Sequence, residues 1–232
     1  MARVRVLRLG AFSVLMLLVT GLLLLVASRP FFDLEPFDRA AVNELLNYQL
    51  SALLVAALAA LVTFAFAGRT LLGYLNLGRS GAMATLTGRP GGGRWETDAW
   101  PIALLMVAVM GTAAFVQVRP GGFDFHWLYV LLVIPLAASN ALVEEVVFRL
   151  SYVSAGARLT RTRWYGLVMG SVVFGVVHYW GIAPNGLAGA VASAFLGYVL
   201  AKSIQETRGF FWAFTIHLLL DVAILLLVLN SA

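Results

Sequence analysis

Long apolar runs separated by short polar segments dominate the pattern of this chain. A helix rises 1.5 Å per residue, so about 20 mostly apolar residues cross the roughly 30 Å hydrocarbon core of a bilayer. Seven stretches meet or approach this length, at about 10–28, 48–67, 99–117, 127–150, 164–180, 186–202 and 210–230. The pattern therefore predicts an all-α, polytopic transmembrane helix bundle of about seven spans.

Basic residues are distributed unequally between the two ends of these spans. Cytoplasmic segments retain Lys and Arg, and one orientation assigns 13 of the 16 basic residues to them: Arg3, Arg5, Arg8, Arg69, Arg79, Arg89, Arg94, Arg149, Arg158, Arg161, Arg163, Lys202 and Arg208. Arg29, Arg39 and Arg119 then lie outside. We expect a cytoplasmic N-terminus, with the first span as an uncleaved anchor rather than a signal peptide.

Composition agrees with an integral membrane protein, since 61% of the 232 residues are hydrophobic and only 12% are charged. The absence of cysteine excludes a disulfide framework, a thiolate metal site and a cysteine nucleophile. The net charge of +5 suits cytoplasmic loops beside anionic lipid, and no segment indicates nucleic-acid binding. Lys202 is the single lysine, and such arginine-rich usage is typical of a GC-rich bacterial genome. We therefore expect a multi-pass protein of the bacterial plasma membrane. Nothing indicates the oligomeric state.

Ionisable residues within the apolar spans divide the chain into two regions. Residues 1–98 form an N-terminal transmembrane region of two spans and a Gly-rich cytoplasmic loop, GRPGGGRWETD, which lacks the lysine and hydroxyl of a phosphate-binding loop. Residues 99–232 form the predicted catalytic core, because every ionisable residue at membrane depth lies there: Glu144, Glu145, Arg149, His178, His217 and Asp221. Charges at this depth are costly, so each is a candidate functional residue.

The stretch VEEVVFRL carries three of these residues. Glu145 and Arg149 are four residues apart, which places them on one helical face as an ion pair. Glu144 lies about 100° around the helix, so it is expected to be free of that arginine. Asn140, one turn before Glu144, shares its face and can extend a polar stripe.

The stretch FGVVH places Phe174 one turn before His178. Gly166 and Gly170 continue the same stripe, and the span at 186–202 also carries small residues at helical spacing. Small residues let helices approach closely, so we expect these two helices to pack tightly through that face.

The stretch HLLLD places His217 and Asp221 one turn apart, where the carboxylate can fix the imidazole tautomer or face a substrate beside it. His126, next to Asp124, is expected to be an exposed interfacial residue. Each motif alone also has a structural interpretation, as a buried ion pair or a helix-to-helix hydrogen bond. Burying the ionisable residues of the three motifs at separate places in the membrane would be costly, which favours one shared polar site.

In this order, EEVVFR, FGVVH and HLLLD resemble the three motifs of the CAAX prenyl endopeptidase and bacteriocin-processing (CPBP or Abi) family of intramembrane proteases. The resemblance covers about residues 100–230, and within the family this chain is similar to the type II CAAX prenyl endopeptidases. It implies that Glu144 activates water with help from His178, and that His217 and Asp221 polarise the scissile carbonyl. Glu145 and Arg149 would support them, together with Asn140 and Phe174. Asp221 departs from the asparagine usual in type II members, so it is expected to orient His217 or to bind a cation.

The residue set also suits amide hydrolysis by direct attack of water, since it contains no cysteine or serine triad. Nitrogen and oxygen ligands from Glu144, His178, His217 and Asp221 could hold a divalent ion such as Zn²⁺, although the HExxH spacing is absent. A glutamate-type and a metal-dependent enzyme therefore both stay open, and no cofactor is assigned.

Helical depth sets a condition on the shared site. Counted from the cytoplasmic ends, Glu144 lies about 12 Å deep and His217 about 10 Å, whereas His178 lies about 21 Å deep. A short hairpin formed by the runs at 164–180 and 186–202 would bring these depths together and open the site to the cytoplasm.

We therefore expect an intramembrane endopeptidase that cleaves a membrane-associated or lipidated peptide near the cytoplasmic membrane face. One alternative is a non-catalytic membrane scaffold or immunity protein with the same fold. Another is a proton- or cation-coupled transporter, although no internal repeat supports it.

Overall fold

A computed structural model describes the chain except for residues 1, 119–120, 123–126, 161 and 231–232, so His126 lies outside the described residues. The elements in chain order are α1 (Ala2–Ser28), α2 (Ala40–Ala67), α3 (Arg69–Tyr74), β1 (Ala82–Met83), β2 (Gly93–Arg94), α4 (Trp95–Val118), α5 (Trp127–Glu144), η1 (Glu145–Leu150), α6 (Ser151–Ala155), η2 (Gly156–Thr160), α7 (Arg163–His178), α8 (Gly186–Thr207) and α9 (Phe211–Leu229). The segments η1 and η2 are π-helical and continue α5 and α6 as one rod. The two short strands pair antiparallel.

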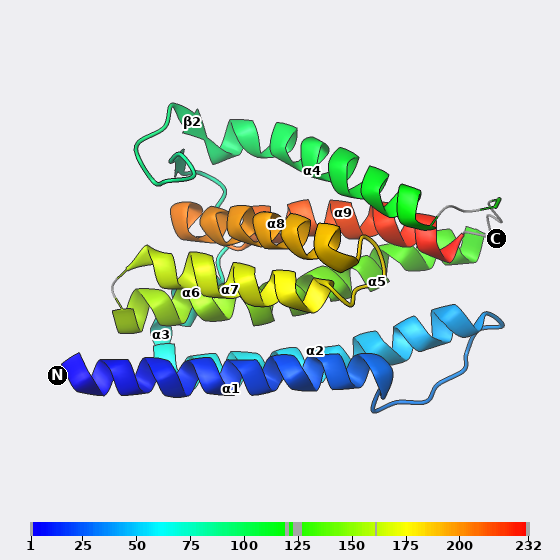
Figure 1. Ribbon diagram of the computed structural model, residues 1–232, viewed down its shortest axis with the longest axis horizontal. Coiled ribbons are helices and arrows are strands. Elements are labelled where there is room, and N and C mark those ends of the chain that lie inside the picture. The colour runs from blue at the N-terminus through cyan, green and yellow to red at the C-terminus, as the bar shows by residue number, and fades with distance from the viewer. Residues whose placement is uncertain (1, 119–120, 123–126, 161, 231–232) are drawn as a thin grey trace.

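Long helices run along one axis of the molecule, as Figure 1 shows. Within the described residues, six helical segments are long and apolar enough to cross a membrane: Arg3–Ser28, Ala40–Ala67, Trp95–Val118, Trp127–Thr160, Gly186–Thr207 and Phe211–Leu229. The expected span at 164–180 corresponds to α7, whose 16 residues are too few for a full crossing. The all-α polytopic bundle is confirmed, with α7 as a shorter helix packed against α8.

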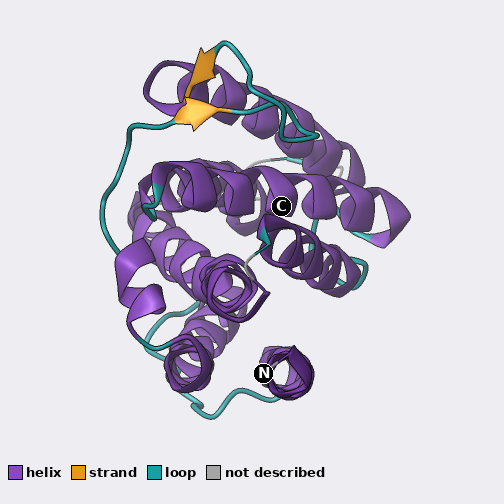
Figure 2. Cartoon of the chain, turned by 90° about the vertical axis from the view of Figure 1, so that its left-hand side faces the viewer, coloured by secondary structure: helices purple, strands orange, loops and turns teal. Residues whose placement is uncertain are grey.

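The two ends of the bundle differ in their connections. The segment between α3 and α4, with its small sheet, lies at the end where α1 begins, and α9 finishes at the opposite end (Figures 1 and 2). The first of these ends carries the basic residues expected to face the cytoplasm, so the cytoplasmic N-terminus stays a prediction based on charge. Arg149, which we counted with them, is instead fully buried inside the bundle.

One hydrophobic core joins the N-terminal helices to the C-terminal half. It includes Phe12 of α1, Ala52 of α2, Ala99 of α4 and Ile216 of α9. The proposed division at residue 98 is therefore not marked by a break in the core, and it stays a prediction.

Helix α2 begins at Ala40, about two turns before the predicted start of its span. Two amide side chains explain the early start. Asn43 exchanges hydrogen bonds with the backbone of Phe37, at 3.0 Å and 2.7 Å, and Asn47 exchanges bonds of 2.9 Å with that of Leu34. The preceding segment is thereby fastened along α2, and the polar first turns of the helix are held within the bundle.

Glycines allow α7 to approach its neighbours, but not in the arrangement expected. A Cβ on Gly170 would lie 2.0 Å from the backbone oxygen of Phe148, and one on Gly166 would lie 2.7 Å from Cα of Val153, so this face packs on η1 and α6. Gly175 instead meets α8, where a Cβ would lie 2.6 Å from the oxygen of Ala190. The predicted tight packing of α7 with α8 is confirmed, and Phe174 of the predicted stripe lies beside Gly197 of α8, but Gly166 and Gly170 pack on α6 and η1 instead.

Candidate functional site

A π-helical turn follows the first of the paired glutamates. Glu144 ends α5 and Glu145 begins η1, in which the backbone N–H of Ser151 bonds the carbonyl of Val146, five residues back. Thr63 of α2 donates a 2.8 Å hydrogen bond to Oγ of Ser151. A π turn is wider than an α turn and often occurs at functional sites. Both glutamates reach His217 of α9, so Glu145 contacts α9 in addition to the arginine that its spacing predicted.

His217 of α9 is the centre of a cluster of carboxylates. Its Nδ1 lies 2.7 Å from Oε1 of Glu145, and its Nε2 lies 3.3 Å from Oε2 of Glu144 and 3.5 Å from Oδ1 of Asp221. The imidazole is buried, as are all three acids. Side chains from α5, η1 and α9 therefore meet around a single ring.

Arg149 compensates part of this negative charge. Its Nη1 lies 3.3 Å from Oε1 of Glu145, which is the ion pair predicted from the four-residue spacing, and the pair is fully buried. The same nitrogen lies 3.5 Å from the backbone oxygen of Glu144. The guanidinium carbon lies 3.5 Å from the ring centroid of Phe174. Nε and Nη2 have no hydrogen-bond partner among the described residues.

Phe174 connects His178 to the cluster. Its ring centroid lies 4.1 Å from that of His178 and 6.0 Å from that of His217. Nδ1 of His178 lies 2.9 Å from the backbone oxygen of Phe174 and, facing a carbonyl, must donate; Nε2 is therefore the basic nitrogen of the neutral ring. His178 interacts electrostatically with Glu144 and His217 but forms no hydrogen bond with either.

The described structure adds residues of α2 that the sequence interpretation missed. Nε2 of Gln49 donates a 3.0 Å hydrogen bond to Oδ1 of Asn140, and Nδ2 of Asn140 donates a 3.1 Å bond to Oδ2 of Asp221. Tyr48 interacts electrostatically with Glu144 and Asp221. Gln49 is a neutral amide and Tyr48 a neutral phenol, so the charge pattern that marks Glu144 and Asp221 in the sequence does not mark them. The available signal was the pair of adjacent polar residues, Tyr48 and Gln49, at the start of the second apolar run.

The cluster contains more negative than positive groups. Three carboxylates face Arg149 and His217, so one negative charge remains even when the imidazole is protonated. Uncompensated charge is costly in a buried position, and an additional proton or polar ligand would reduce that cost. The Glu144 and Asp221 side chains are 11% and 12% exposed, whereas those of Glu145 and Arg149 are fully buried. Access to the cluster is therefore through Glu144 and Asp221.

The possibility of a zinc ion at Glu144, His178, His217 and Asp221 stays a prediction. Among the described residues, no group of three His, Cys, Asp or Glu side chains is placed to hold a metal ion. Both nitrogens of His217 face carboxylates, and Nδ1 of His178 is bonded to a carbonyl. A tetrahedral site needs lone pairs directed at one shared point, so zinc binding would require some of these side chains to turn.

A comparison with family models adds an independent finding. Residues 125–223 match the family described as Type II CAAX prenyl endopeptidase Rce1-like. This segment contains α5 to α8, most of α9 and the three motifs, and it excludes α1 to α4. No curated protein and no solved structure matches the chain.

Proposed function

We propose that this multi-pass membrane protein is an intramembrane endopeptidase in which Glu144 activates water, because residues 125–223 match the Rce1-like model of type II CAAX prenyl endopeptidases. The family is one of proteases, which supports peptide-bond hydrolysis as the reaction that we propose for this site. The identity of the base and the roles of the other residues are our proposal.

The observation that carries this mechanism is the position of His217 among three carboxylates. Glu145 and Asp221 hold the ring from opposite sides, and Glu144 lies beside it at the accessible edge. Oε2 of Glu144 is buried and lies 3.3 Å from Nε2 of His217, whereas the Glu144 side chain as a whole is 11% exposed, so we assign its other oxygen, Oε1, to the water molecule. A base positioned in this way typically contributes 10²- to 10⁴-fold to the rate.

The reaction balances with the residues present. Glu144 takes a proton from water while the water oxygen bonds to the carbonyl carbon, and negative charge develops on the carbonyl oxygen. Protonated His217, whose Nε2 lies between the two partly exposed acids Glu144 and Asp221, stabilises that charge. Glu144 then returns its proton to the amide nitrogen as the C–N bond breaks, which leaves a carboxylate and an amine.

We assign the remaining residues to positioning. Asp221 accepts from Asn140 and faces Nε2 of His217, which suits an acid that orients the imidazole. Nε2 of His178, at the other side of Phe174, can accept a hydrogen bond from the attacking water. Arg149 keeps Glu145 charged and its side chain in place.

We propose a membrane-associated or lipidated peptide as the substrate, cleaved near the cytoplasmic face, and the bacterial plasma membrane as the location. The buried position of the cluster within a bundle of membrane spans supports a substrate that approaches from the bilayer or its surface.

The test is cleavage of lipidated and transmembrane peptides by the purified protein in liposomes. Glu144→Gln should lower the rate at least 10²-fold, as should His217→Ala. Glu44→Gln is the matched control, because Glu44 is an exposed acid on α2, and it should cleave normally. Undiminished cleavage by Glu144→Gln would refute the mechanism. If the unsubstituted protein cleaves no peptide and its Glu144→Gln variant gives the same cellular phenotype, a scaffold is the better interpretation.

Chelation tests the open question of a metal. Since the donors do not converge, we expect cleavage to survive dialysis against a strong chelator. Loss of activity that added Zn²⁺ restores would instead favour the metal-dependent type.

A further inference from the structure

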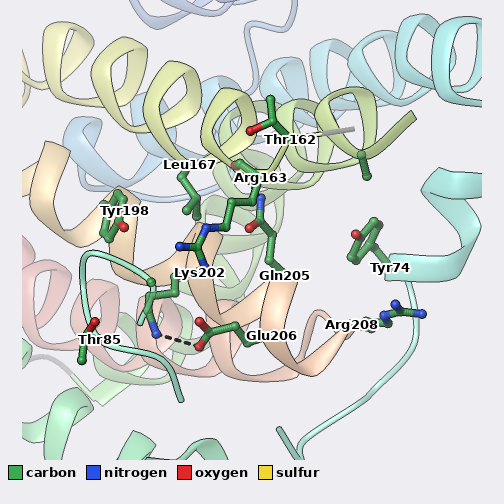
Figure 3. A pocket seen from close by; sticks show the side chains of 12 residues that line it. Tyr74, Thr85, Thr162, Arg163, Leu167, Tyr198, Lys202, Gln205, Glu206 and Arg208 are labelled. Carbon is green, nitrogen blue, oxygen red and sulfur yellow. Dashed lines mark hydrogen bonds and ion pairs between the residues drawn. The ribbon is translucent and has the colours of Figure 1, made fainter. Parts of the chain in front are cut away.

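A second polar site lies apart from this cluster, at the end of the bundle where α1 begins. A cavity of about 480 Å³ lies between the start of α7, the end of α8 and the segment that follows α3. Figure 3 shows Arg163, Lys202, Gln205 and Glu206 grouped in it, with Arg208 and Tyr74 together at one edge. It shares no residue with the candidate active site.

An internally satisfied ion pair lies in this cavity. Nζ of Lys202 lies 2.7 Å from Oε2 of Glu206, and Nε1 of Trp95 donates a 2.8 Å hydrogen bond to the same oxygen. Lys202 is only 5% exposed. Glu206, the one acid in the lining, is thus neutralised by Lys202 and is not free to balance another cation.

Two further cations in the lining have no acidic partner. Neither Arg163 nor Arg208 forms an ion pair with any residue that the structure describes. Nη2 of Arg163 donates a 3.2 Å hydrogen bond to the backbone oxygen of Thr87, and a Cβ on Gly88 would overlap the guanidinium. The Arg163 side chain is therefore held in place by the loop. The cavity consequently carries about two uncompensated positive charges.

Helix ends and neutral donors agree with a site for an anion. The positive pole of α7 lies at Arg163, where Oγ1 of Thr162 accepts from N–H of Trp164. The end of α8 contributes the opposite partial charge, about half a unit, which offsets only part of the charge of Arg208. Tyr74 and Gln205 add polar side chains to the lining.

We propose that this cavity binds a phosphate group, carried by an anionic phospholipid at the membrane surface or by a soluble phosphate compound. Guanidinium groups match phosphate oxygens in two-point hydrogen bonds. Basic pockets among helix ends at the cytoplasmic surface are suited to lipid head groups. This site does not depend on the proposed protease mechanism, because the two share no residue.

The experiment titrates the full-length protein in neutral detergent with phosphatidylglycerol, phosphatidylcholine or inorganic phosphate, and measures affinity from the rise in unfolding temperature. The variant is Arg163→Gln with Arg208→Gln. The matched control is Arg3→Gln with Arg5→Gln, which removes the same charge from the same end of the bundle. We expect the unsubstituted protein to prefer phosphatidylglycerol over phosphatidylcholine, and the cavity variant to lose about tenfold or more in affinity while the control loses little.

The titrations with lipid and with inorganic phosphate also distinguish a lipid head group from a soluble phosphate compound. Binding of inorganic phosphate that requires the cavity arginines would indicate a soluble ligand, whereas binding of phosphatidylglycerol alone would indicate a lipid. If the double variant does not fold, each single variant should still lose about fivefold. Equal affinities of the cavity and control variants for every anion would overturn the proposal.

Discussion

Nδ1 of His217 lies 2.7 Å from Oε1 of Glu145, and that oxygen also lies 3.3 Å from Nη1 of Arg149. One carboxylate oxygen therefore orients the central imidazole and balances a buried guanidinium. Glu144, its neighbour, touches the same imidazole but forms no ion pair with the arginine. This difference between adjacent glutamates leads to different expectations for their removal.

Glu145→Gln should destabilise the fold by about 3–5 kcal/mol, because it leaves Arg149 buried without its counter-charge. Glu144→Gln should change stability much less while it abolishes cleavage. Unfolding in detergent, followed by circular dichroism, measures both. Glu96→Gln is the control, since its partner Arg94 is mostly exposed and such pairs contribute about 0–1 kcal/mol. An unchanged unfolding temperature in Glu145→Gln would contradict the assigned role.

Asp221→Asn should retain cleavage within about tenfold of the unsubstituted protein, the equivalent of one hydrogen bond. Asparagine has the same shape, can still accept from Asn140, and is the residue expected here from the type II pattern. Asp221→Leu removes the contacts to both Asn140 and His217, so it should lose at least 10²-fold in kcat/KM. If the Asn and Leu variants were equally inactive, the negative charge of Asp221 would be the essential property.

Gln49→Leu should reduce kcat more than it changes KM, because Gln49 acts on Asp221 through Asn140. The loss leaves Oδ1 of Asn140 unsatisfied, at a cost of about 1–3 kcal/mol. Gln117→Leu removes another inter-segment amide contact, to the backbone of Asn185. It should leave kcat unchanged.

A double variant separates positioning by Gln49 from a general effect on packing. The double variant Gln49→Leu with Asn140→Leu should have the same kcat as Asn140→Leu alone, because both substitutions break the same chain of hydrogen bonds from Gln49 through Asn140 to Asp221. Additive losses would show that Gln49 acts by another route.

Much of this arrangement could be predicted from sequence because membrane burial makes charge rare. Glu145 and Arg149 stood out in apolar surroundings, and their spacing was sufficient to predict the ion pair. The all-α bundle followed from the length of the apolar runs. These predictions depend on local spacing and on the cost of burying charge, both of which can be evaluated without knowing the tertiary contacts.

The rest depended on geometry that spacing does not encode. The π turn after Glu144 changes which side chains reach His217, and no residue type in VEEVVFRL specifies it. Gln49 is neutral and lies on a distant helix, so its link to Asp221 arises only from the packing of α2 against α5. The close contact of α7 with η1 was missed because a glycine stripe indicates a near neighbour without identifying it.

Gly170→Ala tests whether that contact positions the site. A Cβ at this position would lie 2.0 Å from the backbone oxygen of Phe148, so α7 and η1 must separate. Overpacking of this kind costs about 1–3 kcal/mol. Phe174 and His178 lie on α7, and Glu145 lies on η1. Separating the two helices therefore moves these side chains apart, and we expect kcat to fall. Gly111→Ala is the control, because a Cβ there meets no atom within 4 Å, and it should fold and cleave normally. Normal activity in a destabilised Gly170→Ala protein would show that the α7–η1 contact serves the fold alone.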